Sequence, residues 1–179
     1  MIITRQDPFL FRLQTGDITL NFRTDPRHLE LKTIHKQVTM DTAGEYEIEG
    51  IVVDSAPEDP IFYTIYWDDM VIGLGGIKSG PPDRQSGRAG PPDRMTPVIR
   101  AGVSYDILLL FVAHPSEMIK KLANADARIL IPFGEEKVIA SFIEELDESP
   151  EEMDKLTIKK KDIPTEGERR IVVLKPLKK

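Results

Sequence analysis

The chain has 179 residues, of which 40% are hydrophobic and 30% charged, and this balance is typical of one folded domain with a substantial core. No apolar run approaches the length of a membrane span and the first residues do not resemble a signal peptide, so we expect a cytoplasmic protein. The lack of cysteine excludes thiol catalysis and thiolate zinc sites, and a net charge of −6 argues against binding to nucleic acid.

The first half of the chain alternates between apolar and polar residues, as antiparallel strands do. Residues 9–13 and 18–22 each place three apolar side chains on one face, and Thr15-Gly16-Asp17 between them has the composition of a hairpin turn. Asp68-Asp69 is the expected tight connection of a second hairpin. Further strand-like runs cover residues 46–53, 61–67 and 70–74.

The second half of the chain alternates between strand and helix. A continuous apolar run at residues 106–112 is typical of a strand that is covered on both faces. A helix is predicted from Pro115 to about Ala125, followed by a strand at 128–132 and a helix at about 135–146. The pattern predicts a mixed α/β protein with antiparallel strands first and strand-helix-strand-helix later.

One segment repeats itself and has no apolar periodicity. Residues 79–85 recur nearly intact as 89–95, and residues 80–94 contain four prolines, three glycines and three arginines. This composition indicates a surface loop at 79–96, and the functional alternative is an arm that binds a partner. The candidate contact residues of such an arm are Arg84, Arg88 and Arg94. A short helix is predicted to follow at 97–102.

Four segments of the chain form an ordered set of landmarks. They are Gly44-Glu45-Tyr46-Glu47, Val71-Ile72-Gly73-Leu74-Gly75-Gly76-Ile77, Asp106-Ile107-Leu108-Leu109-Leu110 and Arg128-Ile129-Leu130-Ile131-Pro132-Phe133-Gly134. In this order they resemble the small bacterial and archaeal branch of the metallo-β-lactamase fold, which is related to lactonases and general metal-dependent hydrolases. The resemblance implies a single domain over residues 1–179 with an abbreviated, layered αββα sandwich. It also implies that 154–158 and 169–176 form a closing hairpin.

The resemblance implies a metal site that this chain lacks. Members of the family hold two zinc ions with a His-x-His-x-Asp-His cluster, a further histidine, an aspartate in Leu-Gly-Asp and a histidine after Ile-Pro-x. No such cluster occurs in this sequence, and the matched segments place Gly76 at the aspartate and Gly134 at the last histidine. Because glycine has no side-chain ligand, we expect a degenerate member of the family without a metal or other cofactor.

Three histidines remain as candidates for chemistry. His28 and His35 are seven residues apart, which on a helix would place them two turns apart rather than at chelating distance. His28 is otherwise explained by an exposed polar loop. His114 follows a strand end and is either a catalytic group or a capping or surface residue. The glycine-rich run 73–76 lacks the lysine of a phosphate loop and is read as a tight turn.

These observations favour a catalytically inactive protein that serves as a binding, scaffold or assembly module. The expected partner is a second copy of the chain or another protein, and no membrane is involved. Phe133 is expected to lie on the interaction surface left by the lost metal cleft. The alternative is a divergent metal-dependent hydrolase of a small phosphate ester or lactone, with a rebuilt site that uses His28, His35 or His114. A third, weaker interpretation is an anion or nucleotide bound in the vestigial cleft.

Overall fold

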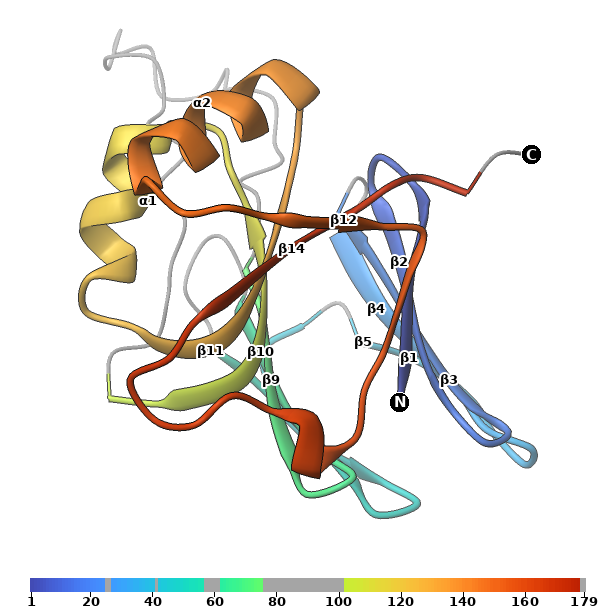
Figure 1. Ribbon diagram of the computed structural model, residues 1–179. Helices are drawn as coiled ribbons and strands as arrows, with labels where there is room; N and C mark the ends of the chain where they lie inside the picture. The colour runs from blue at the N-terminus through green and yellow to red at the C-terminus, as the bar shows by residue number, and fades with distance from the viewer. Residues whose placement is uncertain (25–26, 41, 57–61, 76–101, 178–179) are drawn as a thin grey trace, which may run out of the picture.

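The protein is a sandwich of two β-sheets with helices over one of them (Figure 1). The computed structural model describes residues 1–24, 27–40, 42–56, 62–75 and 102–177. Within these residues no helix is long and apolar enough to cross a membrane. The duplicated loop at 79–96, with Arg84, Arg88 and Arg94, lies outside the described residues, as does most of the helix predicted at 97–102.

The first sheet has six strands in the order β13-β1-β2-β3-β4-β5, and all of its pairings are antiparallel. Its hairpin at Gly16, which has a φ of +56°, confirms the turn expected from the sequence. The strands are β1 (Ile2–Asp7), β2 (Leu10–Thr15), β3 (Ile18–Thr24), β4 (Arg27–Lys32), β5 (Gln37–Met40) and β13 (Lys155–Thr157).

The second sheet has eight strands in the order β12-β14-β11-β10-β9-β8-β7-β6. Strands β6 to β9 form an antiparallel meander, whereas β9, β10, β11, β14 and β12 run parallel to one another. The strands are β6 (Gly44–Ile48), β7 (Ile51–Ala56), β8 (Phe62–Trp67), β9 (Met70–Leu74), β10 (Ser104–Phe111), β11 (Asp126–Phe133), β12 (Glu151–Met153) and β14 (Arg170–Leu174).

Two α-helices cover the outer face of the eight-stranded sheet. They are α1 (Pro115–Leu122) and α2 (Glu136–Leu146), and a 3-10 turn, η1 (Lys160–Asp162), lies farther along the chain. Figure 1 shows both helices on the side of this sheet that faces away from β1 to β5. Phe142 of α2 and Met118 of α1 are fully buried against Tyr105 and Leu108 of β10, so the parallel strands are covered on both faces.

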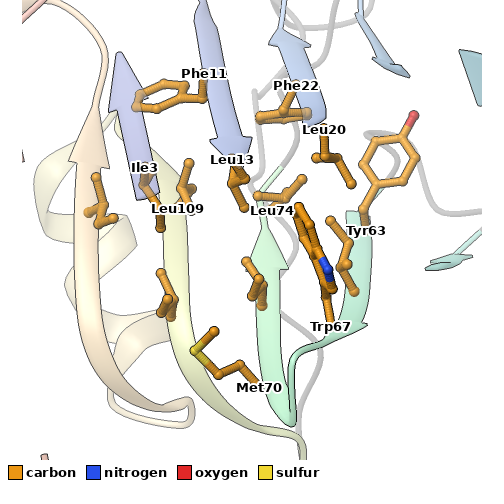
Figure 2. Close-up of a cluster of buried hydrophobic side chains, with 14 of the residues drawn as sticks. Ile3, Phe11, Leu13, Leu20, Phe22, Tyr63, Trp67, Met70, Leu74 and Leu109 are labelled. Atoms are coloured by element: carbon orange, nitrogen blue, oxygen red, sulfur yellow. The ribbon is translucent and has the colours of Figure 1, made fainter. Parts of the chain in front are cut away.

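The main core lies between the two sheets (Figure 2). Alternate residues of each strand point inward, so that Phe11 and Leu13 of β2 face Leu74 of β9 and Leu109 of β10. All four side chains are completely buried, and each such burial stabilises the fold by roughly 1.5–3 kcal/mol. Within the described residues, the outward face of the six-stranded sheet carries mainly polar side chains. This face can therefore contact water without a covering layer.

Two expectations for the first half of the chain were wrong. Residues 46–53 are not one strand but the hairpin of β6 and β7, because Glu49 and Gly50 both have a positive φ and reverse the chain. The polar loop expected around His28 is also wrong. His28 lies in β4, and His35 lies in the turn that joins β4 to β5.

The expected closing hairpin is also absent from the described structure. Strand β13 pairs with β1 in the six-stranded sheet, whereas β14 pairs with β11 and β12 in the eight-stranded sheet. The two segments therefore belong to different sheets, and the chain that joins them connects the two layers. A local sequence pattern does not distinguish these arrangements, since both satisfy the same alternation of apolar residues.

Candidate functional site

The candidate site is the edge where parallel strands β9, β10 and β11 end together. Phe111 of β10 lies opposite Phe133 of β11, and Leu109 lies opposite Leu74 of β9. Backbone hydrogen bonds of 2.8 Å, from Gly75 N to Leu109 O and from Val112 N to Phe133 O, extend the ladder past the strand ends. Ligands of open α/β sheets gather at the carboxyl ends of such strands. Gly76 would follow here but lies outside the described residues.

Gly134, the other predicted vestigial ligand position, is fixed at this edge by its backbone. Its φ is +144°, a conformation that residues with a side chain rarely adopt. A Cβ atom at this position would lie 2.8 Å from the carbonyl oxygen of Val112 and 3.4 Å from Cε2 of Phe111. No residue with a side chain fits at position 134 unless the backbone shifts.

Aromatic side chains fill the space beneath this edge. The ring centroid of Phe133 lies 4.8 Å from that of Phe11, 5.7 Å from Phe111 and 6.4 Å from Phe22. The side chain of Phe133 is 0% exposed. The prediction that Phe133 lies on an interaction surface is therefore wrong, because the alternation of β11 turns this ring toward β2 and β3 in the core.

Arg5, which the sequence analysis did not select, reaches the same edge from the other sheet. Its Nη2 donates to the carbonyl oxygens of Gly134 and Pro8, both at 3.3 Å, and its Nη1 donates to Leu174 O at 3.4 Å. The guanidinium carbon lies 6.0 Å from the ring centroid of Phe11, within range of a cation–π contact. Arg5 thus joins β1 to the ends of β11 and β14.

The charge of Arg5 is buried. Only 4% of the residue is exposed, and burial lowers the pKa of its guanidinium from the ordinary value, whereas the carboxylates of Glu136 and Asp7 act in the opposite direction. Arginine remains protonated near neutral pH in spite of such a shift. The sequence did contain a signal: Ile3 and Arg5 alternate in β1, so an arginine occupies an inward position of an otherwise apolar strand face.

The structure does not bring the three histidines together. His28 and His35 belong to the six-stranded sheet, whereas His114 precedes α1 at the end of β10. His114 is exposed and its side chain forms no capping hydrogen bond, although its carbonyl oxygen accepts from Met118 N at 3.1 Å. Throughout the described ranges no group of three or more His, Cys, Asp or Glu residues is placed to hold a metal ion.

The glycine-rich run begins inside a strand rather than at a turn. Gly73 belongs to β9, where a Cβ atom would lie 2.8 Å from side-chain atoms of Leu108 and Tyr105. The turn interpretation was therefore wrong for Gly73. The glycine is explained by close packing of β10 side chains against the backbone of β9.

A second buried charge, Asp106, lies in the first half of β10, away from the candidate edge. Its Oδ2 accepts from Val71 N at 2.8 Å and from Lys160 Nζ at 2.7 Å, and its Oδ1 lies 3.9 Å from Arg128 Nη1. These contacts tie β10 to β9, β11 and η1. Because its charge is matched by two cations and an amide, Asp106 acts as a structural crosslink.

The fold of this chain is similar to that of a solved structure. No protein-family model matches the chain, and no curated protein matches it either. Among solved structures, the chain is similar to a candidate Zn-dependent hydrolase of the metallo-β-lactamase superfamily from Thermotoga maritima. The TM-score is 0.63 at 16% identity, over 97% of this chain and 98% of that chain. The chain therefore has the metallo-β-lactamase fold, which confirms the predicted layered α/β sandwich.

Proposed function

We propose that this chain is a degenerate member of the lactonase-like branch of this fold, catalytically inactive and used as a binding, scaffold or assembly module. The observation that supports it is the lack of room for a side chain at Gly134. A ligand side chain at this position requires a Cβ atom that would lie 2.8 Å from Val112 O, in a backbone conformation of positive φ.

The surroundings of Gly134 support the same proposal. The edge where a metal would be held is occupied by the rings of Phe111 and Phe133 and by the guanidinium of Arg5, which donates to Gly134 O. These groups offer no lone pair to a metal ion, and a buried cation repels one. Gly76 and Gly134 are accordingly proposed as vestigial ligand positions.

Assembly with a second copy or with another protein is the proposed use of the retained frame. The contact surface excludes the buried ring of Phe133. Large apolar side chains that are exposed within the described residues provide the alternative contacts, and they are Ile2, Phe9, Ile34, Tyr66 and Leu177. Light scattering should give a mass at least twice that of one chain at tens of micromolar. A monomer at that concentration would contradict homo-oligomer formation.

The alternative function, hydrolysis of a small phosphate ester or lactone, is favoured by the fold that the chain shares with a candidate hydrolase. Assays with chromogenic phosphodiester and lactone substrates, after incubation with Zn²⁺, Mn²⁺ or Fe²⁺, separate the two functions. We expect hydrolysis no faster than with the metal salts alone. Saturable turnover that disappears in His28→Ala, His35→Ala or His114→Ala would establish a rebuilt site instead.

A further inference from the structure

A pocket of about 260 Å³ lies between α2 and β14, and Arg5 forms part of its wall. Ile139 and Ile143 of α2 and Val173 of β14 supply apolar surface on either side. Glu136, at the start of α2, also lines it. Pockets for small molecules are mostly apolar with a few fixed polar groups, and this volume is slightly below the roughly 300 Å³ at which their usual range begins, so it suits a ligand of few atoms.

The guanidinium of Arg5 is incompletely satisfied for a buried charge. Three of its five N–H groups donate, all to uncharged backbone carbonyls at 3.3–3.4 Å, whereas hydrogen bonds between ionised groups are about 2.7–2.9 Å long. Its Nε is buried without a hydrogen-bond partner. No ion pair formed among the described residues includes Arg5. A buried polar group in this state is costly to leave unpaired.

The other charges that line the pocket decide what could approach Arg5. Lys175 Nζ already lies 2.8 Å from Oε2 of Glu152, so this cation is matched within the wall. Glu136 is exposed and acts on Arg5 through space rather than by direct contact. With Glu152 paired to Lys175, Glu136 is the remaining anion of the lining, and it repels a dianion such as phosphate more strongly than a monoanion. A single carboxylate with an apolar remainder matches both Arg5 and the isoleucine and valine walls.

We propose that this pocket binds a small organic carboxylate with a short aliphatic part, whose carboxylate is bound by Arg5. A guanidinium and a carboxylate match in geometry and charge, and their attraction is strong where water is excluded. The aliphatic part of the ligand packs against α2 and β14. The pocket shares Arg5 with the edge at Gly134, but binding of a carboxylate in it does not require that the edge lack a metal, so either proposal can fail alone.

The test uses isovalerate as the probe and isovaleramide, which has the same shape without the charge, as its control. Binding is followed by NMR of the Arg5 Nε–Hε resonance and by thermal unfolding. Ala140→Phe is designed to fill the pocket while Arg5 itself is left unchanged, because Ala140 is an exposed pocket residue on α2. Ser141→Phe, at the neighbouring exposed position outside the pocket lining, is the matched control. Arg5→Met removes the buried cation.

We expect isovalerate to shift the Arg5 resonance saturably and the amide to have no effect. Binding should weaken at least about tenfold in Ala140→Phe and in Arg5→Met, and should be unchanged in Ser141→Phe. If Arg5→Met does not fold, the comparison of Ala140→Phe with Ser141→Phe still tests whether isovalerate binds in the pocket. The proposal is overturned if isovalerate gives no saturable shift, if the amide binds equally, if Ala140→Phe binds as well as Ser141→Phe, or if inorganic phosphate binds more tightly than isovalerate.

Discussion

Arg5 and Asp106 are the two charged residues that are buried within the described core, and their surroundings are opposite. Asp106 contacts two cations and a backbone amide, whereas the polar and ring contacts of Arg5 within the described ranges are to carbonyl oxygens and one aromatic ring. A matched buried charge is a structural tie, and an unmatched one is a place where a ligand of opposite charge is stabilised. Asp106 therefore has a structural role, whereas Arg5 is the residue proposed to bind a ligand.

The role of Asp106 can be measured by Asp106→Asn. This variant should lower the free energy of unfolding by about 2–3 kcal/mol, because Lys160 and Arg128 lose their anionic partner. The loss stays below that of a fully buried pair since the side chain of Lys160 is 49% exposed and can turn to water. Lys160→Met, measured in parallel by chemical denaturation, should cost only about 1 kcal/mol. Asp106→Asn with the stability of the unmodified chain would refute the crosslink.

The close approach at Gly134 predicts an unequal cost for two glycine substitutions. Gly134→Ala should destabilise the fold by about 2–3 kcal/mol, since it combines an unfavourable φ with the contact to Val112 O. Gly16→Ala also has a positive φ but meets no atom within 4 Å, so its cost should be about 1 kcal/mol. Thermal or denaturant unfolding of the two variants compares them directly. Equal costs would show that position 134 has room for a side chain.

The ion pair between Glu151 and Arg170 predicts a pH dependence. Nε and Nη2 of Arg170 lie 2.5 and 2.6 Å from the two carboxylate oxygens of Glu151, and this hydrogen bonding lowers the pKa of Glu151 from its ordinary value of 4.5. The pKa of Glu151 is thus lower in the folded chain than in the unfolded chain, where it is about 4.5. The pair therefore adds stability above about pH 4.5, and this stability is lost as the pH falls through the lower pKa of the folded chain. Because the pair is exposed, its contribution is about 0.5 kcal/mol.

The measurement is the unfolding free energy of the unmodified chain and of Glu151→Gln between pH 7 and pH 3. The two curves should differ at pH 7 and converge as the pH falls. Glu166→Gln, at an exposed position, serves as the control and should follow the unmodified chain throughout. A difference between Glu151→Gln and the unmodified chain that grows toward low pH would contradict this assignment.

Among the elements, α2 has the clearest energetic role because its apolar stripe covers the parallel strands. Phe142→Ala should cost about 3–5 kcal/mol, since this ring is fully buried between α2 and the eight-stranded sheet. Phe9→Ala makes the same chemical change at a side chain that is 42% exposed and should cost less than about 1 kcal/mol. Denaturant titration of both variants checks the difference. A similar cost for both would mean that α2 does not pack on the sheet as described.

The elements also show which features a sequence can predict. The spans of β8 to β11, α1 and α2 follow from local periodicity and end near their expected residues. Sheet partners do not follow from it: β13 pairs with β1, about 150 residues away, and no local pattern specifies that pairing. The turn at Glu49 was missed because glutamate rarely adopts a positive φ.

The candidate site was predictable only in part. The landmarks located the edge at Gly134, but Phe133 was placed on the surface and Arg5 was not selected. Both errors have one physical cause, which is that burial at this edge depends on β1, β2 and β3 of the opposite sheet. Only the sandwich as a whole turns the ring and the guanidinium inward.

At the scale of the whole molecule, we propose that the metallo-β-lactamase fold is retained without its metal site. The edge of the parallel strands is occupied by aromatic rings, a glycine with no room for a side chain, and a guanidinium from the facing sheet. A metal site needs three or four converging donors, and affinity for the metal then adds directly to folding stability. Metal content is therefore the property that most directly distinguishes a chain without a metal site from a metal-dependent hydrolase.

The direct test is elemental analysis of the purified chain after exposure to excess Zn²⁺, Mn²⁺ or Fe²⁺ and removal of free metal by desalting. We expect well under one ion per chain, and the same result for His28→Ala, His35→Ala and His114→Ala. One or two tightly held ions per chain, lost in any of these three variants, would contradict it.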